Sequence, residues 1–293
     1  MSRKKDQNFT TCNVCEQPQT FEVAKEVKVI PSNMSQFKHQ QFTVWRCNNC
    51  HTLHSKEAVD LDLYYENYFK KINLNYFTSC AYWQQIQLLK KYGLKQSHNI
   101  LDFGCNQGSF LKVLKQLGYR QAKGYDPYVS EFADSTILND RYDVITSYDV
   151  IEHVEKPRLF FQQMVRCLEI GGLLLIGTPN ATQVDFSDIY CPELHQPYHR
   201  HILSQKALIN LGLSSGLEVV KVIHRWCYDT LLPGVNTRFI LSYVKRLGNM
   251  IDCLEDPPHI GMVLTSPLLL FYFFWGYFFP TPGNVIILFR RCR

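Results

Sequence analysis

The sequence predicts an α/β domain with a mostly parallel sheet, preceded by a small β-rich module at the N-terminus. From residue 99 onward, short apolar strands alternate with amphipathic helices. Residues 173–178 (LLLIGT) are continuously apolar, as a strand buried on both faces is. The N-terminal module is predicted from two C-x2-C pairs, at residues 12–15 and 47–50, which bracket alternating apolar and polar residues.

Composition limits the class of protein. The chain has 293 residues, of which 46% are hydrophobic and 19% are charged, so it can bury a sizeable core. The net charge of +5 is spread along the chain without a concentrated basic patch, and no nucleic-acid partner is expected. The first twenty residues are polar and do not resemble a signal peptide, so the eleven cysteines indicate a reducing, cytoplasmic compartment.

Residues 1–55 are predicted to form the N-terminal module. Within it, residues 21–30 (FEVAKEVKVI) and 42–47 (FTVWRC) alternate apolar and polar side chains and are predicted as half-exposed strands. Residues 56–98 are predicted to be a connector followed by N-terminal helices. The last of these helices, residues 80–94, places its apolar residues on one face and has a glycine near its end.

The two cysteine pairs predict a metal site. Because 31 residues separate two C-x2-C pairs, four thiolates can surround one point, which is the coordination of a structural Zn²⁺ ion. His51 and His54 follow closely, and either could replace a cysteine. A thioredoxin-like redox site is disfavoured because neither pair opens a helix after a strand. The predicted zinc ligands are Cys12, Cys15, Cys47 and Cys50.

The α/β domain is predicted to comprise residues 99–227 and 281–293. Its helices bury residues three or four apart, and its strands are short apolar runs. One helix has Pro157 in its first turn and is expected to end at Gly171 and Gly172. Further helices are predicted at 109–119 and 204–216, and strands at 99–103, 122–126, 142–148, 173–178, 217–226 and 284–291.

Residues 228–280 interrupt this alternation and are predicted to be an aromatic-rich helical insertion. Residues 266–280 (SPLLLFYFFWGYFFP) hold twelve consecutive apolar residues between two prolines. A bilayer span needs roughly 20, so the segment is predicted to be a buried or lid helix. Two alternatives are that the segment contacts a membrane surface or that it forms a dimer interface. The predicted location is cytoplasmic, with membrane association and oligomeric state left open.

Residues 100–110 (ILDFGCNQGSF) read as a strand that enters a glycine-containing turn and then a helix. A dinucleotide fingerprint has a glycine where Asn106 stands, so a nicotinamide cofactor is disfavoured. Asparagine is the non-glycine residue that best tolerates positive φ, so the turn is still expected to form. Asp126 lies 22 residues after Gly104, at the end of the next strand, where a carboxylate can accept both ribose hydroxyls of an adenosine.

Residues 100–110 resemble motif I of class I S-adenosylmethionine-dependent methyltransferases, which has an acidic residue two positions before a glycine. Residues 141–157 (RYDVITSYDVIEHVEKP), 168–180 (LEIGGLLLIGTPN) and 198–208 (YHRHILSQKAL) are similar to later segments of the small-molecule branch of this family, in the same order. The resemblance covers residues 80–225 and the last strand. It implies a Rossmann-like fold with a mostly parallel sheet and an antiparallel last strand, and methyl transfer from S-adenosylmethionine.

The resemblance also implies the cofactor site. Asp102 would attract the α-ammonium group, the loop would cradle the methionine portion, and Asp126 would hold the ribose. Fifteen residues separate Asp126 from Tyr142, so the family's third strand is expected to be trimmed or absent. Asp134 is the candidate for the adenine contact. The full set of predicted cofactor-binding residues is Asp102, Gly104, Cys105, Asn106, Gly108, Asp126, Pro127, Asp134, Tyr148 and Asp149.

Methyl transfer from a sulfonium is an in-line displacement, in which a base helps when the acceptor is a hydroxyl or an acidic carbon. Histidine suits this role because its ordinary pKa is near 6.5. Two segments that follow the predicted strands 142–148 and 173–178 supply candidates. At least one of three histidines is expected to contact the acceptor, with a tyrosine sharing the role. The candidates are His153, Tyr198, His199 and His201.

A zinc ribbon joined to this type of methyltransferase resembles enzymes of sugar-nucleotide, polysaccharide and secondary-metabolite pathways. The resemblance implies O- or C-methylation of a small-molecule acceptor, either sugar-linked or apolar. An RNA or protein methyltransferase that grips its substrate with the ribbon is the first alternative. A catalytically dead methyltransferase fold that serves as a zinc-dependent interaction module is the second.

Overall fold

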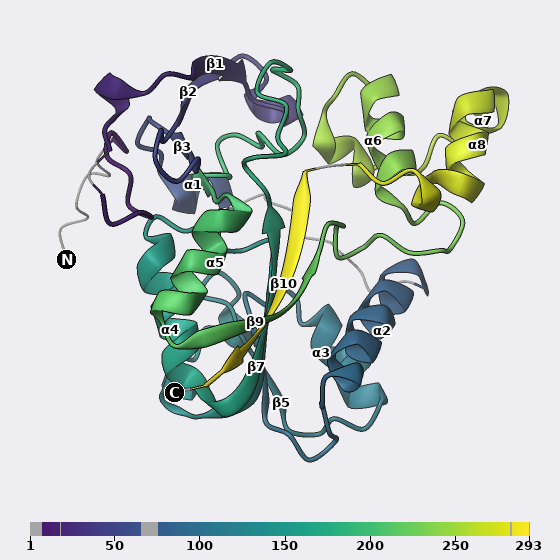
Figure 1. The fold of residues 1–293 in the computed structure, drawn as a ribbon. Coiled ribbons are helices and arrows are strands. Elements are labelled where there is room, and N and C mark those ends of the chain that lie inside the picture. The colour runs from purple at the N-terminus through teal and green to yellow at the C-terminus, as the bar shows by residue number, and fades with distance from the viewer. Residues whose placement is uncertain (1–7, 18, 66–75, 282, 293) are drawn as a thin grey trace.

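The computed structural model describes residues 8–17, 19–65, 76–281 and 283–292. The strands of these residues form two sheets (Figure 1). A six-stranded sheet runs through the α/β domain, and a four-stranded sheet lies in the N-terminal region. Residues 66–75 of the predicted connector lie outside the described residues.

The six-stranded sheet confirms the predicted fold class. Its first four strands in the chain are parallel neighbours, and the last strand runs antiparallel to both of its partners. The spatial order is β5-β4-β6-β7-β10-β9. The strands are β4 (Ile100–Phe103), β5 (Ala122–Tyr125), β6 (Tyr142–Tyr148), β7 (Leu168–Pro179), β9 (Leu217–Ile223) and β10 (Asn284–Arg291).

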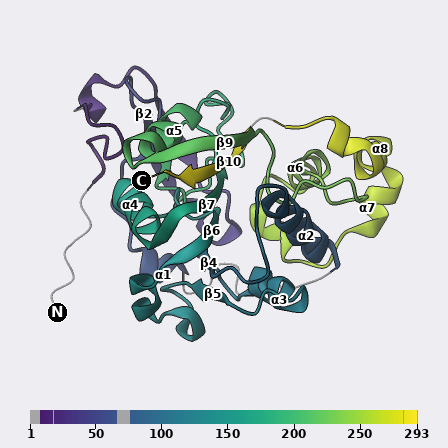
Figure 2. The ribbon, with the colours of Figure 1, turned by 60° about the horizontal axis from the view of Figure 1, so that its bottom comes forward.

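Helices cover both faces of this sheet (Figure 1). Helices α2 (Tyr76–Lys91) and α3 (Ser109–Gln116) lie on one side, and α4 (Pro157–Cys167) and α5 (Gln205–Ser214) on the other (Figure 2).

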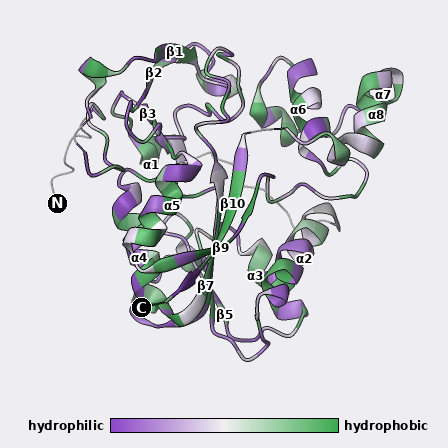
Figure 3. Ribbon diagram, viewed as in Figure 1, coloured by the Kyte–Doolittle hydropathy of each residue, from purple (hydrophilic) through white to green (hydrophobic). Residues whose placement is uncertain are grey.

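Successive strand residues point to opposite faces, which divides the core between these two layers. Leu101 and Leu174 pack with α4 and α5, whereas Ile100 and Leu175 pack with α2 and α3. The central strands β7 and β10 therefore carry long hydrophobic runs, as Figure 3 shows for β10.

One helix boundary was predicted wrongly. The helix expected to run from Pro157 to Gly172 ends at Cys167, and β7 begins at Leu168. Gly171 has φ +81°, which a right-handed helix excludes. The pairing of β6 with β7 also shifts here, from Leu168 to Leu173. The two glycines thus accommodate an irregularity at the start of a strand and do not stop the helix.

The connection between β5 and β6 agrees with the expected loss of the third strand. Residues 127–141 are all described, and they form two short 3-10 helices and no strand. These helices are η3 (Ser130–Phe132) and η4 (Ser135–Asn139). Strand β5 is consequently the edge of the sheet on this side.

The small sheet joins two distant parts of the chain. Strands β1 (Val27–Pro31), β2 (Gln41–Arg46) and β3 (Leu53–Ser55) come from the N-terminal region, and β8 (His201–Ile202) follows β7 in the chain. All neighbours are antiparallel. The strand predicted at 21–30 was partly wrong, because residues 21–23 form a 3-10 helix and the strand begins at Val27. A short helix, α1 (Leu61–Tyr65), follows the sheet.

The insertion between β9 and β10 is helical, as the sequence predicts. It contains α6 (Thr237–Arg246), η5 (Ile251–Leu254), α7 (Ile260–Thr265), α8 (Pro267–Trp275) and η6 (Gly276–Phe278). Both views place these helices near α2, beyond the carboxyl ends of the parallel strands (Figures 1 and 2).

The aromatic segment is not the buried helix that was one expectation. Leu269 of α8 is buried, but Trp275 is 56% exposed and Phe278 is 60% exposed. None of the helices in the described part of the chain is long and apolar enough to cross a bilayer.

Candidate functional site

A large cavity of about 2890 Å³ opens at the carboxyl ends of β4, β5 and β6. Its walls come from the β4–α3 loop, the segments after β5 and β6, α1, and the helical insertion. This is the edge of an α/β sheet where ligands bind. The cavity brings together most of the predicted site residues, namely Asp102, Gly104, Cys105, Asn106, Asp126, Pro127, Tyr148, Asp149, His153 and His199.

The β4–α3 loop keeps its turn without a middle glycine. Asn106 has φ +45°, between Gly104 at +86° and Gly108 at +69°, so asparagine adopts the positive φ that the sequence predicts for it. A Cβ added at Gly104 would lie 2.3 Å from a methyl carbon of Val150, so the loop and the segment after β6 are in close contact. Gly108 caps the start of α3.

The backbone at Asn106 gives a test that separates its conformation from its side chain. Asn106→Ala is expected to lower the free energy of unfolding by about 1 kcal/mol, because alanine is disfavoured at positive φ. Asn106→Gly keeps the turn and removes only the amide. If both variants weaken S-adenosylmethionine binding in calorimetry, the amide contacts the cofactor. If the glycine variant binds normally, the contribution of Asn106 is conformational.

Asp102 is buried at the end of β4. Its carboxylate accepts a hydrogen bond from the Thr146 hydroxyl on the neighbouring strand, at 2.8 Å. Burial raises the pKa of Asp102 to about 7. A cationic group beside the carboxylate would favour its ionised form.

The Asp102 carboxyl predicts a pH dependence of stability. Because its folded-state pKa of about 7 exceeds the ordinary value of 3.8, the folded protein retains a proton that the unfolded chain releases from about pH 4 upward. The free energy of unfolding is therefore expected to fall as the pH rises toward 7, by up to about 1.4 kcal/mol per pH unit from this group. Denaturant titrations of cofactor-free wild-type and Asp102→Asn protein measure this decline.

The Asp102→Asn protein is expected to show a shallower decline than the wild type. Some decline remains, because burial also raises the pKa of Asp126 and of Asp149. Identical slopes for the two proteins would contradict the assignment to Asp102.

Asp126 links the end of β5 to the β4–α3 loop. One carboxylate oxygen accepts from the backbone N–H of Asn106 at 3.0 Å, and the other accepts from the N–H of Tyr128 at 2.9 Å. Each carboxylate oxygen can accept more than one hydrogen bond. The side chain is therefore held in place with acceptor capacity remaining toward the cavity.

The adenine contact predicted for Asp134 does not match its position. Asp134 is exposed outside the cavity and caps η4, where its carboxylate accepts from the backbone N–H and hydroxyl of Thr136 at 2.9 and 2.6 Å. Glu131 lines the cavity instead. Both acidic residues lie in the short segment after Asp126, and the sequence did not distinguish a capping residue from a cavity residue.

Tyr148 ends β6 at the cavity wall, and Asp149 follows it there. Asp149 has φ +52°, and its carboxylate accepts from the indole N–H of Trp226 at 3.1 Å. Burial raises the pKa of Asp149 to about 6. The Tyr148 hydroxyl is buried and has no hydrogen-bond partner among the described residues. Trp226 was not predicted as a site residue, and it lies at the end of the expected 217–226 strand.

Two of the three candidate histidines face each other in the cavity. The rings of His153 and His199 lie edge to face, with centroids 4.8 Å apart. Nδ1 of His153 is 2.8 Å from the Tyr65 hydroxyl, and Nδ1 of His199 is 2.6 Å from the Glu193 carbonyl oxygen. Burial lowers the pKa of His199 to about 4 and that of His153 well below its usual value, so both are neutral at pH 7. His195 also lines the cavity.

His201 and Tyr198 are not in the cavity, which corrects two of the predicted acceptor contacts. His201 belongs to β8, and its Nδ1 lies 2.9 Å from Nδ1 of His54 across the small sheet. The Tyr198 hydroxyl donates to the Tyr64 carbonyl, and the Tyr198 ring stacks on His195. Pairing of β8 with β3 draws this part of the segment into the core of the small sheet.

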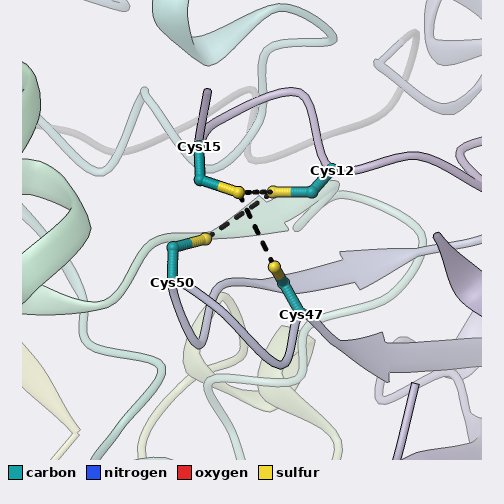
Figure 4. A group of neighbouring side chains, drawn as sticks. All are labelled: Cys12, Cys15, Cys47 and Cys50. Carbon is teal, nitrogen blue, oxygen red and sulfur yellow. Dashed lines mark hydrogen bonds between the residues drawn. The ribbon is translucent and has the colours of Figure 1, made fainter. Parts of the chain in front are cut away.

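The four predicted zinc ligands form one cluster (Figure 4). The sulfur atoms of Cys12 and Cys15 are 3.5 Å apart, those of Cys12 and Cys50 are 3.6 Å apart, and those of Cys15 and Cys47 are 3.8 Å apart. Four sulfurs at about 2.3 Å from a tetrahedral ion would be roughly 3.8 Å from one another. The cluster thus fits a Cys₄ zinc site without a histidine.

The cysteine cluster is tied to the loop after β6. The Asn13 side chain, between two of the cysteines, donates to the Glu155 carbonyl at 2.8 Å. The Ser204 hydroxyl donates to the Cys50 carbonyl at 2.6 Å. The position of the cysteine cluster therefore helps to fix the loop that carries His153.

Residues 74–222, about half of the chain, match the sequence model of a protein family that is described as a methyltransferase domain. The chain belongs to this family. Its sheet has the parallel core and antiparallel last strand predicted for class I S-adenosylmethionine-dependent methyltransferases.

Individual relatives are more distant. The mitochondrial ubiquinone biosynthesis O-methyltransferase of Dictyostelium discoideum is 25% identical over an alignment of 119 residues, and the match covers 30% of this chain and 37% of that protein. The ubiquinone biosynthesis O-methyltransferase of Nitrobacter winogradskyi is 26% identical over 108 residues, covering 30% and 41%. The chain thus spans less than half the length of these curated relatives.

The chain is also similar to solved structures, at low sequence identity and low TM-scores. A putative sarcosine dimethylglycine methyltransferase from Galdieria sulphuraria is 17% identical, with a TM-score of 0.46 over 72% of this chain and 85% of that one. Geranyl diphosphate C-methyltransferase from Streptomyces coelicolor A3(2) is 13% identical, with a TM-score of 0.44 over 71% and 78%.

Proposed function

We propose that the protein transfers the methyl group of S-adenosylmethionine to a small-molecule acceptor, by O- or C-methylation. The observation that carries this proposal is the convergence of two sets of residues on one cavity. Asp102 and Asp126 line the part of the cavity that we assign to the cofactor. The neutral histidines His153 and His199 also line the cavity. The curated relatives are named for O-methylation, which favours oxygen as the methyl acceptor.

The cofactor would lie across the carboxyl ends of β4, β5 and β6. In this placement, Asp102 attracts the α-ammonium group and Asp126 accepts from the ribose hydroxyls. The backbone of residues 104–108 approaches the methionine portion, which the positive φ angles in this loop support. The Tyr148 hydroxyl, which has no hydrogen-bond partner within the described residues, and the Asp149 carboxylate complete this part of the cavity wall.

The histidines would act on the acceptor. A hydroxyl oxygen attacks the methyl carbon while the carbon–sulfur bond breaks, which leaves S-adenosylhomocysteine and releases the hydroxyl proton. His153 or His199 accepts that proton in the simplest scheme, because a neutral imidazole has a free lone pair. The Tyr65 hydroxyl and the Glu193 carbonyl orient the two rings.

The helical insertion supports an acceptor with an apolar portion. The part of the cavity wall that comes from the insertion is made largely of hydrophobic side chains. Residues 266–280 also carry exposed aromatic residues outside the cavity, including Trp275 and Phe278. We place a membrane-surface contact at these residues, since aromatic side chains are favoured at the bilayer interface.

The cysteine cluster is proposed to hold one structural Zn²⁺ ion. Four protein thiolates would fill its coordination shell, so this ion would take no part in the chemistry. Its contribution would be to fold the N-terminal module and to position the loop after β6 through Asn13.

Two measurements test the proposed function. Calorimetry is expected to show saturable binding of S-adenosylmethionine and of S-adenosylhomocysteine to the full-length protein. The absence of binding would favour the dead-fold alternative. The purified protein is then incubated with a cell extract and methyl-labelled S-adenosylmethionine. After solvent extraction, the label is expected in the organic phase. Label in protein or RNA would favour a macromolecular substrate instead.

A further inference from the structure

A second group of metal-ligand side chains lies beside the cavity, and two of its three members, His153 and His199, line the cavity wall. The ligand atoms of Glu152, His153 and His199 all lie within 4.8 Å of one another. Glu152 and His153 follow β6, whereas His199 comes from the segment between β7 and β8. The three side chains belong to two loops that are far apart in the chain and share this one point.

The outer partners of these ligands hold them as a metal site requires. Nδ1 of His199 is 2.6 Å from the Glu193 carbonyl oxygen, which can only accept, so Nδ1 carries the proton and Nε2 carries the lone pair. Nδ1 of His153 is 2.8 Å from the Tyr65 hydroxyl. Metal-ligating histidines commonly use their second nitrogen in this way.

Glu152 supplies the independent observation. Its side chain is fully buried. One carboxylate oxygen accepts from the Thr178 hydroxyl at 2.9 Å, and the other has no hydrogen-bond partner among the described residues. None of the ion pairs found in the described part of the chain includes Glu152. A buried carboxylate normally requires a hydrogen-bond partner or a cation.

We propose that Glu152, His153 and His199 bind a divalent transition-metal ion, separate from the Cys₄ site. Two imidazoles and one carboxylate suit Zn²⁺, Mn²⁺ or Fe²⁺. Mg²⁺ and Ca²⁺ prefer oxygen ligands and are disfavoured. Three protein ligands leave coordination positions open for a substrate, as in catalytic metal sites.

The chemical consequence rests on the proposed function. An acceptor hydroxyl bound to the ion would have a lowered pKa and would release its proton to water. The resulting oxygen anion attacks the methyl carbon of the cofactor, the carbon–sulfur bond breaks, and S-adenosylhomocysteine leaves with the bonding pair on sulfur. In this scheme His153 and His199 hold the ion, and neither accepts the proton.

Mn²⁺ is the probe that tests this site. It prefers oxygen and imidazole ligands to thiolates, so it reports on this cluster while zinc stays with the cysteines. Electron paramagnetic resonance titration of the full-length protein is expected to show one bound Mn²⁺ per chain. Spin-echo spectra of the wild type are expected to show coupling to imidazole nitrogen. Glu152→Gln and His199→Ala are each expected to weaken binding more than about 10-fold.

The matched control is His39→Ala, which removes an exposed histidine outside the cluster and is expected to bind Mn²⁺ normally. Absence of bound Mn²⁺ in the wild type, or equal affinity in all four proteins, overturns the proposal. If Glu152→Gln does not fold, His199→Ala and the nitrogen coupling in the wild type still decide. Calorimetry with S-adenosylmethionine on the same samples separates the two proposals, because normal cofactor binding without Mn²⁺ binding refutes only the metal site.

Discussion

Cys47→Ser is expected to leave the protein with one zinc ion fewer per chain and with an unfolded N-terminal module. Cys47 is fully buried, and its sulfur lies 3.8 Å from that of Cys15 in the cluster. Zinc binding contributes on the order of 10 kcal/mol to the folding of small zinc modules. Loss of one ligand removes most of that contribution. Elemental analysis measures the zinc, and limited proteolysis measures the unfolding of residues 8–55.

The effect is expected to extend beyond the module. Asn13 and Cys50 make hydrogen bonds to the α/β domain, and Cys12 and Trp45 pack in the same core cluster as Leu174 of β7. The melting temperature of the whole chain should therefore fall as well.

Cys292→Ser is the matched control, because Cys292 is an exposed cysteine far from the cluster in sequence. It is expected to retain the wild-type zinc content and melting temperature. If wild-type protein that has been stripped of zinc melts at the same temperature as the zinc-loaded protein, the structural role of the metal is refuted.

The architecture could be predicted because the strands are strongly patterned. Strands β7 and β10 are buried on both faces, so each is a nearly continuous hydrophobic run that few other structures accommodate. The loop after β4 could be predicted as well, because Gly104 and Gly108 have the positive φ that their residue type favours. Local chemistry and the fold agree in these segments.

The errors arose where tertiary contacts decide among equivalent local patterns. A glycine pair after a helix usually stops it, but Gly171 and Gly172 sit in an irregular β7 because that strand pairs with β6. His199 and His201 are alike in sequence, yet only His201 lies within β8, which pairs with β3. Tertiary pairing of this kind leaves no signal in a single sequence.

Other site residues carried no recognisable motif. Tyr65 and Glu193 reach the histidines through one hydroxyl and one carbonyl oxygen. Carbonyl contacts in particular depend on the backbone path and not on residue type. Trp226 contacts Asp149 from the segment after β9, which is distant in the chain. Only the folded topology brings these residues to the carboxyl ends of the strands.

Asp126→Ala is expected to reduce the affinity for S-adenosylmethionine by more than about 100-fold in calorimetry. Hydrogen bonds that involve a charged partner contribute about 1.5 to 3 kcal/mol each, and the proposed site gives the ribose two of them. The substitution also leaves the backbone N–H groups of Asn106 and Tyr128 without their acceptor, which loosens the loop against β5. Both effects act in the same direction.

Two further variants separate the ribose contact from loss of the loop. Asp140→Ala removes an exposed carboxylate that pairs with Lys123, beyond the cavity, and is expected to bind the cofactor normally. Asp126→Asn keeps the side-chain shape and one oxygen that can still accept from one of the two backbone N–H groups. It therefore retains part of the loop contact while the ribose loses its charged partner. An intermediate loss of affinity in Asp126→Asn therefore supports the ribose role. Near-normal affinity in Asp126→Ala refutes it, because the proposed ribose hydrogen bonds would then contribute nothing to the affinity.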